Sequence, residues 1–164
     1  MWFLVSPGNP LKDTRALPPL GVRVRAARLL LNHPRLKVTG TEAAFNTRYT
    51  ADTLETLARR APGVQFVWLM GADNLAQFHR WQRWRDIARL MPIAVYHRPG
   101  HGFAALSSPT AQTLAYRRLP EQAASLLPFM PAPAFTYLTG VTSPLSSTAL
   151  RRAGQRANAA VSQT

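Results

Sequence analysis

The stretch Gln65-Phe-Val-Trp-Leu-Met-Gly-Ala-Asp-Asn74 decides the fold of this chain. Residues 65–70 form a continuous apolar run, without the alternation of a half-exposed strand. Such a run is typical of a strand buried on both faces of a parallel sheet. Residues 71–74 then place a flexible glycine and a carboxylate directly after that strand. The stretch therefore predicts an interior strand of an α/β domain, with a candidate site at its carboxyl end.

Strand and helix patterns alternate on both sides of this stretch. Helical spacing of apolar residues predicts helices over about 20–32, 50–62, after residue 74, and over 82–91. Short apolar runs predict strands over 2–5, 36–40, 92–96 and 134–138. A loop is expected over 41–46, a surface excursion over 100–133, and a short helix over 146–152. This alternation predicts an α/β fold, an open and mostly parallel sheet with helices on both faces.

Length and composition limit the organisation of the chain. With 164 residues and 46% hydrophobic content, the chain is long enough for one domain with its own core. We expect that domain over residues 1–154 and a flexible tail over 155–164. There is no cysteine, which excludes disulfides and thiolate zinc sites. No apolar run approaches the roughly 18 residues of a membrane span, so we expect no membrane partner and a cytoplasmic protein.

The charge of the chain is strongly positive. Twenty lysines and arginines stand against seven acidic residues, which gives a net charge of +13. A balance of this kind indicates partners that carry phosphate. It suits a nucleic-acid-binding module, and it equally suits an enzyme that holds the phosphates of a nucleotide. Charge alone leaves both classes open.

In an open α/β sheet, ligands bind beyond the carboxyl ends of the strands, so the residues that follow each strand are the site candidates. After the last expected strand, Ser146, Ser147 and Thr148 stand at a predicted helix start and Arg151 follows about one turn later. Free backbone N–H groups at a helix start favour an anion, so this segment is a candidate phosphate site. The alternative interpretation is an ordinary helix cap with a solvated arginine.

Two further candidates follow from residues 71–81. Gly71 allows a ligand to approach the backbone, and Asp73 can accept hydrogen bonds from ribose hydroxyls, although it can also simply cap the next helix. Trp81 offers a stacking face for an aromatic ring, whereas the usual role of a tryptophan is in the core.

Tyr49 and Thr50 stand at the start of the helix expected from residue 50, with Thr50 as its cap. The free N–H groups of that turn can hold a ligand carboxylate, and the alternative is capping alone. Arg98, at the end of the strand over 92–96, is available to a phosphate. The histidines at 79, 97 and 101 have no spacing typical of a metal site, so no protein-bound metal is expected.

Five segments, in this order and spacing, resemble the bacterial nicotinate-nucleotide adenylyltransferase family. They are VSPGNPLK (5–12), NTRYTADTL (46–54), WLMGADNLAQFHRW (68–81), HRPG (97–100) and SSTALR (146–151). The resemblance covers the chain from Trp2 to about Gly154. It implies a Rossmann-like fold and an enzyme that joins nicotinate mononucleotide to the AMP part of ATP, with the help of Mg²⁺. The products are deamido-NAD and pyrophosphate.

The resemblance also implies roles for the candidate residues. Tyr49 and Thr50 would offer backbone amides to the nicotinate carboxylate, and Trp81 would stack on the pyridine ring. The nucleotide crevice would be lined by Gly71 and Asp73. Phosphate would be neutralised by Lys12 and Arg98 and gripped by Ser147, Thr148 and Arg151. In such a reaction one substrate's phosphate attacks the other's α-phosphorus, so positioning and charge neutralisation carry the catalysis.

The chain departs from the family pattern in one respect. The family's first strand leads into a loop G-x-F-x-P-x-H-x-G-H, whose histidines bind the ATP phosphates, and no such motif occurs here. A strand and its crossover helix need roughly 30 residues. The expectation is that the first, central strand of the order 3-2-1-4-5-6 is missing ahead of Trp2, that Met1 is an internal or mis-called start, and that the catalytic residues are unknown.

Two other function classes remain open from the sequence. A non-catalytic relative that binds nucleotide without turnover is the more serious alternative, and a turnover assay separates it from the enzyme. A nucleic-acid-binding module is less favoured, because the basic residues are dispersed and no reader motif occurs. The expected partners are therefore ATP and nicotinate mononucleotide rather than nucleic acid. The oligomeric state is left open.

Overall fold

The computed structural model describes residues 1–8, 17–47 and 49–141. Its strands are β1 (Trp2–Leu4), β2 (Lys37–Thr39), β3 (Trp68–Gly71), β4 (Ile93–Tyr96), β5 (Arg118–Leu119) and β6 (Phe135–Leu138). Its α-helices are α1 (Leu20–Leu30), α2 (Thr41–Ala44), α3 (Thr50–Arg60), α4 (Ala72–Gln77), α5 (Trp84–Leu90), α6 (Gly102–Leu106) and α7 (Pro109–Thr113). Three 3₁₀-helices complete the described elements: η1 (Phe78–Arg80), η2 (Ala115–Arg117) and η3 (Glu121–Phe129).

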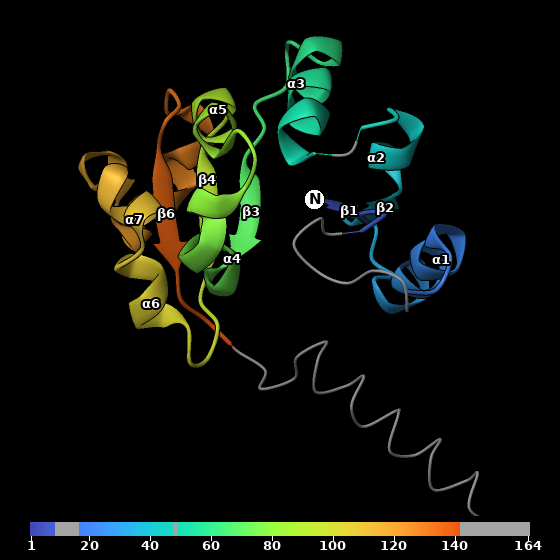
Figure 1. Ribbon diagram of the computed structural model, residues 1–164, viewed down its shortest axis with the longest axis horizontal. Helices are drawn as coiled ribbons and strands as arrows, with labels where there is room; N and C mark the ends of the chain where they lie inside the picture. Colours follow the sequence, from blue (N-terminus) through green and yellow to red (C-terminus); the bar gives the residue numbers. More distant parts are fainter. Residues whose placement is uncertain (9–16, 48, 142–164) are drawn as a thin grey trace, which may run out of the picture.

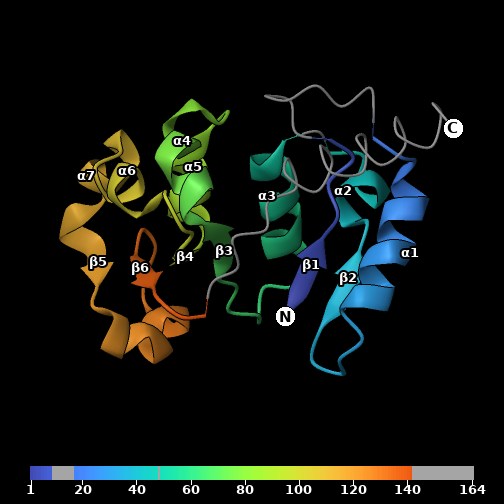
Figure 2. The same ribbon diagram turned by 90° about the horizontal axis from the view of Figure 1, so that it is seen from below.

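The strands form two parallel sheets. One has the order β1-β2 and the other the order β3-β4-β6-β5, and every neighbouring pair is parallel. These orders match the two flanks of the expected 3-2-1-4-5-6 arrangement, with β5 added at the far edge. In the described part of the chain, no ladder joins β1 to β3. Both views show the four-stranded sheet on one side of α3, and β1, β2, α1 and α2 on the other (Figures 1 and 2).

Helices cover both faces of the four-stranded sheet, as the sequence predicted. Ile93 and Val95 of β4 belong to the larger core, which they share with residues of α3 to α7. Ala94, between them, faces the other side and packs in a small core with Leu127 of η3. Because successive residues of a strand point to opposite faces, β4 is buried by a helical layer on each side. The α/β fold class is confirmed.

The run 65–70 is not buried on both faces as predicted. Only Trp68 to Met70 of that run lie in β3, and Leu69 is 43% exposed. The reason is the position of β3, which within residues 1–8, 17–47 and 49–141 pairs with β4 alone and forms an edge of its sheet. On the face of Leu69, the small core reaches Val67 but does not include Leu69.

Residues 100–133 are not the surface excursion that the sequence indicated. The segment contributes the strand β5 and several helices, and it buries Ala105, Ala111, Leu114 and Leu127. The start of α7 is well defined, since the hydroxyl of Ser108 accepts a hydrogen bond from the Ala111 N–H at 3.2 Å. Helices of five residues and 3₁₀ turns are too short to show a 3.6-residue period, and this explains why the pattern was missed.

Smaller differences concern the regions around α2 and α3. Residues 41–44 form the short helix α2, where a loop was expected. Thr50 is the first helical residue of α3, and Tyr49 occupies the cap position predicted for Thr50. The helix expected over 146–152 lies outside the described residues. Within residues 1–8, 17–47 and 49–141, no helix is long and apolar enough to cross a bilayer.

Candidate functional site at the carboxyl ends of β3 and β4

A pocket of about 320 Å³ lies where β3 and β4 end. The residues after the two strands meet there because parallel neighbours end at the same edge of a sheet. Three of the predicted site residues, Gly71, Asp73 and Arg98, line it together. Among the described residues, the lining consists of Gly71, Asp73, Asn74, Tyr96, His97, Arg98, Pro99 and Val141.

Gly71 precedes α4, and the carboxylate of Asp73 lies directly over it. A Cβ atom on residue 71 would stand 2.6 Å from Asp73 Oδ1, so a side chain there would force this carboxylate to move. The glycine therefore lets Asp73 approach the backbone in its present position. It keeps the floor of the pocket free for the Asp73 side chain.

Asp73 and Arg98 form an ion pair across the pocket. Arg98 Nη1 donates to Asp73 Oδ2 at 2.8 Å, and both side chains retain some solvent exposure, 36% for Arg98 and 22% for Asp73. The pair ties the loop after β4 to the start of α4. A phosphate that approaches Arg98 therefore meets a guanidinium that already holds a carboxylate, and a ribose hydroxyl that approaches Asp73 meets the same pair.

His97 is held by a residue that the sequence did not single out. Its Nδ1 lies 2.9 Å from the Tyr137 hydroxyl, and burial raises the pKa of Tyr137 above its usual value. Gly102 makes room for this pair, because a Cβ there would lie 3.2 Å from His97 Cε1. The register of β4 and β6, in which Val95 stands opposite Tyr137, is the signal that could have identified the tyrosine.

The pocket is bounded on its outer side by the end of β6. The Tyr96 hydroxyl donates to the Val141 carbonyl at 2.8 Å. Beyond β6, the carboxylate of Glu121 accepts hydrogen bonds from the N–H and the hydroxyl of Thr139, and these bonds hold the pKa of Glu121 below its usual value. Both contacts fix the chain where it leaves the sheet.

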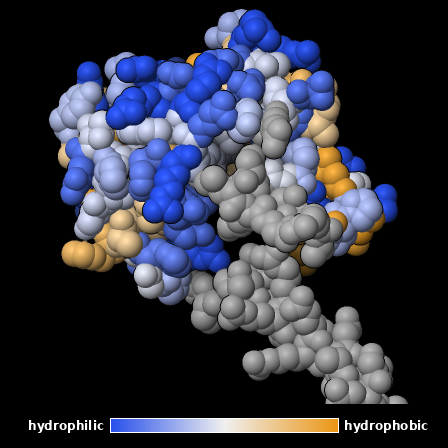
Figure 3. All heavy atoms as spheres, in the orientation of Figure 1, coloured by the Kyte–Doolittle hydropathy of each residue, from blue (hydrophilic) through white to orange (hydrophobic). Residues whose placement is uncertain are grey.

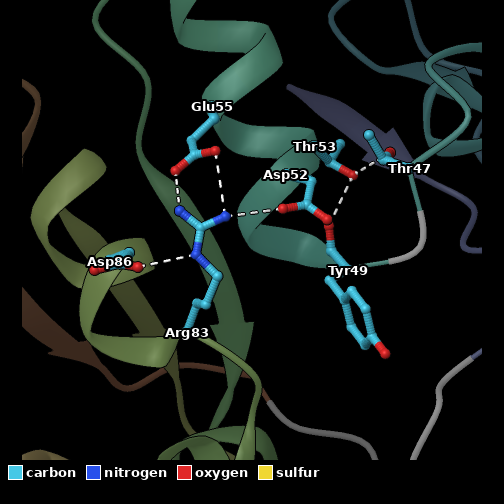
Figure 4. A network of polar contacts seen from close by, with 7 residues as sticks. All are labelled: Thr47, Tyr49, Asp52, Thr53, Glu55, Arg83 and Asp86. Carbon is cyan, nitrogen blue, oxygen red and sulfur yellow. Dashed lines mark hydrogen bonds and ion pairs between the residues drawn. The ribbon is translucent and has the colours of Figure 1, made fainter.

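Tyr49 and Thr50 lie at the start of α3, and neither lines the pocket. The Tyr49 carbonyl accepts a hydrogen bond from the Thr53 hydroxyl, and Thr53 also contacts Thr47 at 2.7 Å (Figure 4). The Tyr49 side chain makes no capping bond to the first turn, and Figure 4 shows it directed away from the helix. The first-turn N–H groups are therefore not capped by this side chain.

Arg83, before α5, joins α5 to α3. Its guanidinium binds Asp52 at 2.9 Å and Asp86 at 3.0 Å, and it pairs with Glu55 as well (Figure 4). The hydrogen bonds to Glu55, first, and to Asp86 raise the pKa of Arg83 above its usual value. The network holds α3, and with it Tyr49 and Thr50, against the four-stranded half.

Trp81 follows η1 and packs against the larger core, edge-on to Phe78 with ring centroids 5.4 Å apart. It is only partly buried, and it does not line the pocket. Its indole Nε1 is buried and has no hydrogen-bond partner within the described structure. The core role is therefore observed, and the ring also carries an unused donor.

A buried carboxylate and an arginine lie near the two-stranded sheet of β1 and β2. Glu42 of α2 is 7% exposed, and burial raises its pKa, while a hydrogen bond from the Ser6 side chain acts in the opposite direction. Arg23 of α1 donates to the carbonyls of Ser6 and Pro7, both at 2.8 Å, and so fixes the loop after β1. Sequence reasoning missed Glu42, because nothing in its local pattern signals burial.

Four predicted residues, Lys12, Ser147, Thr148 and Arg151, lie outside the described residues, as does Ser146. Among residues 1–8, 17–47 and 49–141, no group of three or more His, Cys, Asp or Glu side chains is placed to hold a metal ion.

Comparison with known proteins shows the family of this chain. Residues 1–153 match the family model described as cytidylyltransferase-like. The probable nicotinate-nucleotide adenylyltransferase of Brucella abortus is 54% identical over 152 residues, which cover 93% of this chain and 78% of the relative. The chain belongs to the cytidylyltransferase-like family and, within it, to the nicotinate-nucleotide adenylyltransferases. The resemblance drawn from the five sequence segments is thereby confirmed.

Other relatives carry the same name. The probable nicotinate-nucleotide adenylyltransferase of Mesorhizobium japonicum is 52% identical over 93% of this chain and 78% of its own. That of Methylorubrum extorquens is 53% identical over 92% of this chain and 82% of its own. A solved structure of nicotinic acid mononucleotide adenylyltransferase from Plasmodium falciparum, complexed with APC, matches with a TM-score of 0.48 and 14% identity, over 81% of this chain and 57% of that one.

Proposed function

We propose that this protein transfers the AMP part of ATP to nicotinate mononucleotide, forming deamido-NAD and pyrophosphate. The observation that carries the proposal is the pocket at the ends of β3 and β4, where Gly71, Asp73 and Arg98 meet in a chain 54% identical to a relative of that name. The pocket holds both a cation for phosphate and a carboxylate for hydroxyl groups. We assign this activity to the cytoplasm and to small-molecule partners.

In this proposal the pocket takes the nucleotide. Arg98 neutralises phosphate, and Asp73 accepts from ribose hydroxyls once substrate displaces part of their ion pair at 2.8 Å. Because arginine forms charge-assisted hydrogen bonds with phosphate as it does with carboxylate, phosphate can compete with Asp73 for the guanidinium. The pair thus keeps both groups in place before substrate arrives.

The start of α3 takes the nicotinate carboxylate. Helix N-termini favour anions, and the Tyr49 side chain makes no capping bond to the first turn of this 11-residue helix. Trp81 offers its ring to the pyridine and remains partly exposed for it. The Arg83 network positions α3 for this role.

The remaining phosphate contacts are proposed from the sequence. Lys12, Ser147, Thr148 and Arg151 provide two cations and two hydroxyls for the ATP phosphates. Mg²⁺ is proposed to enter with ATP, because this ion commonly binds through substrate phosphates and retains several waters.

We also propose that a further parallel strand completes the sheet between β1 and β3 and carries the family's histidine loop. Support comes from the edges of the two sheets. Among the strands of the described residues, β1 pairs only with β2, and β3 pairs only with β4. The amino ends of these edge strands approach each other, with the rings of Trp2 and Phe66 at 6.1 Å. An unpaired interior edge leaves backbone groups without partners, which a strand would satisfy.

The test of the proposed function is pyrophosphate release from MgATP by the chain extended with a strand and G-x-F-x-P-x-H-x-G-H segment. We expect nicotinate mononucleotide to be preferred over nicotinamide mononucleotide, because only the former carries a carboxylate. A charge-assisted hydrogen bond is worth roughly 1.5–3 kcal/mol, or about ten- to a hundredfold in kcat/KM. Equal kcat/KM values would refute the assignment of α3. Nucleotide binding without pyrophosphate release would favour the non-catalytic alternative.

A further inference from the structure

A second pocket lies on the opposite half of the molecule, along the outer edge of β2 and the end of α1. It measures about 400 Å³ and adjoins another of about 410 Å³ that shares Arg28 and Asn32 with it. Neither shares a residue with the pocket at β3 and β4. Figure 2 shows α1 and β2 side by side, away from β4 and β6. The first pocket is lined by Arg28, Leu31, His33, Leu36, Lys37 and Val38, with Asn32 and Thr39.

The polar groups of this pocket are mainly hydrogen-bond donors. Arg28 is oriented by its Nε, which donates to the Val38 carbonyl at 3.3 Å, and this leaves its terminal nitrogens available. Lys37 adds an ammonium group. His33 Nδ1 accepts from the Arg35 N–H at 3.2 Å, so Nε2 is the ring nitrogen that remains to donate.

The edge of β2 supplies a backbone donor as well. The N–H of Lys37 donates to the Met1 carbonyl, and the Thr39 carbonyl accepts from Val5, so both residues bond to β1. In a parallel ladder the residue between them directs its N–H and carbonyl to the other side. The Val38 carbonyl is taken by Arg28, and its N–H faces the outer edge of the sheet, beside the guanidinium.

The cations of this region have no counter-ion among the described residues. Arg25, Arg28 and Lys37 form no ion pair there, and no carboxylate lines either pocket. The acidic side chains of the described residues are used elsewhere. Three surround Arg83, Asp73 holds Arg98, Glu121 binds Thr139, and Glu42 is buried. No acidic side chain of the described residues therefore compensates the positive charge at α1 and β2.

We propose that this pocket binds a small organic phosphate ester, at a site separate from the adenylyl-transfer pocket. The phosphate lies between Arg28, Lys37 and the Val38 N–H, where a guanidinium fork, an ammonium and a backbone donor converge. The organic part packs on Leu31 and Leu36, which are only partly buried. The pocket volume falls within the roughly 300–1,000 Å³ range usual for small-molecule sites.

The test is an NMR titration of the ¹⁵N-labelled protein with adenosine 5′-monophosphate and, separately, with inorganic phosphate. We expect adenosine 5′-monophosphate to shift the amide resonances of Lys37 and Val38, and inorganic phosphate to shift them with weaker affinity because it lacks the organic part. The amides of Gly71 and Arg98 report the other pocket in the same spectra. If no shift occurs at Gly71 and Arg98, the shifts at Lys37 and Val38 still test the second pocket independently.

The decisive variant is the double substitution Arg28→Gln and Lys37→Gln, compared with Arg59→Gln and Arg117→Gln. The control pair removes the same charge from exposed positions outside the pocket. The first pair should weaken the response at Val38 by about tenfold or more, and the second should leave it nearly unchanged. Arg28→Lys keeps the charge but loses the planar guanidinium, so it should weaken the response at Val38 by less than the double variant. It replaces the double variant in the test if that variant does not fold.

Three results would overturn the proposal. One is the absence of any shift at Val38 at millimolar ligand. Another is an equal loss of affinity in the control pair, which would show attraction to net charge alone. The third is unchanged binding at Val38 in the Arg28→Lys and double variants.

Discussion

The two halves of the molecule differ in how they are held together. The half built on β3, β4, β6 and β5 has a continuous core, whose buried residues come from α3 to α7 and from three strands. In the half built on β1 and β2, Val38 is the one buried hydrophobic residue among those described up to Thr47. Figure 3 shows a largely hydrophilic surface over the four-stranded half, broken by a patch near α6, where Phe103 is exposed.

The smaller half therefore depends on contacts with the larger one. Leu4 and Phe45 pack against the larger core, and the Arg60 guanidinium lies 4.6 Å from the centre of the Phe45 ring. Since hydrophobic burial is the main favourable contribution to folding, a sheet with one buried apolar side chain has little stability of its own. The smaller half therefore relies on its packing against the larger half.

The largest expected effect comes from the core of the larger half. Phe78 is fully buried and contacts the rings of Trp81 and Trp84, at centroid distances of 5.4 and 6.1 Å. Phe78→Ala should lower the free energy of unfolding by about 3–5 kcal/mol, through lost burial and the cavity left behind. Denaturant unfolding measures this, and Phe103→Ala, at an 88% exposed residue, is the control and should stay within about 0.5 kcal/mol of wild type. Comparable losses in both variants would contradict the core assignment.

The matching change in the smaller half should have a smaller effect. Val38 is 7% exposed but has few buried apolar neighbours, so Val38→Ala should cost about 1–2 kcal/mol. Hydrogen exchange should show faster opening of β1 and β2 in this variant, with little change at β4. Uniform acceleration in both sheets would mean that the halves unfold as one unit.

A substitution at Glu42 should stabilise the protein, whereas the substitutions at Phe78 and Val38 should destabilise it. Burial raises the pKa of Glu42 above its ordinary 4.5, so the folded state binds this proton more tightly than the unfolded state. Stability should therefore fall as the pH rises through the interval between the unfolded and the folded pKa. Glu42→Gln, which cannot ionise, should be more stable than wild type at neutral pH, and the difference should disappear below about pH 4. A constant difference at all pH values would show that ionisation is not its cause.

The smallest expected effect concerns the link between α3 and α5. Arg83→Lys keeps one charge and loses the fork that reaches Asp52, Glu55 and Asp86. Because these groups are partly solvated, the melting temperature should fall only slightly, and the difference should narrow in high salt. Thermal unfolding at two salt concentrations measures this, with Arg85→Lys as a control outside the network. An effect independent of salt would argue against an electrostatic link.

The sequence predicted the parts of the fold that rest on long, regular patterns. The strands over 92–96 and 134–138 and the helix over 20–32 are present within one or two residues. The prediction for residues 100–133 was wrong, because the helices there are too short to show a helical repeat of apolar residues. The exposure of Leu69 was not visible either, since burial of a strand depends on which neighbours pair with it.

For the site, residue types and strand ends predicted where Gly71, Asp73 and Arg98 would meet. The ion pair between the last two, and the support of His97 by Tyr137, depend on the register of strands far apart in sequence. No local pattern carries that information. The roles of these residues in binding substrate stay predictions.

The most direct test of the whole account compares the 164-residue chain with the same chain preceded by a strand and a G-x-F-x-P-x-H-x-G-H loop. Thermal unfolding and pyrophosphate release from MgATP and nicotinate mononucleotide are measured for both. If the strand lies between β1 and β3, the longer form should unfold at a clearly higher temperature and release pyrophosphate, and the 164-residue chain should be less stable and nearly inactive. A 164-residue chain as stable and as active as the longer form would contradict both the placement of the strand and the catalytic role of its histidines.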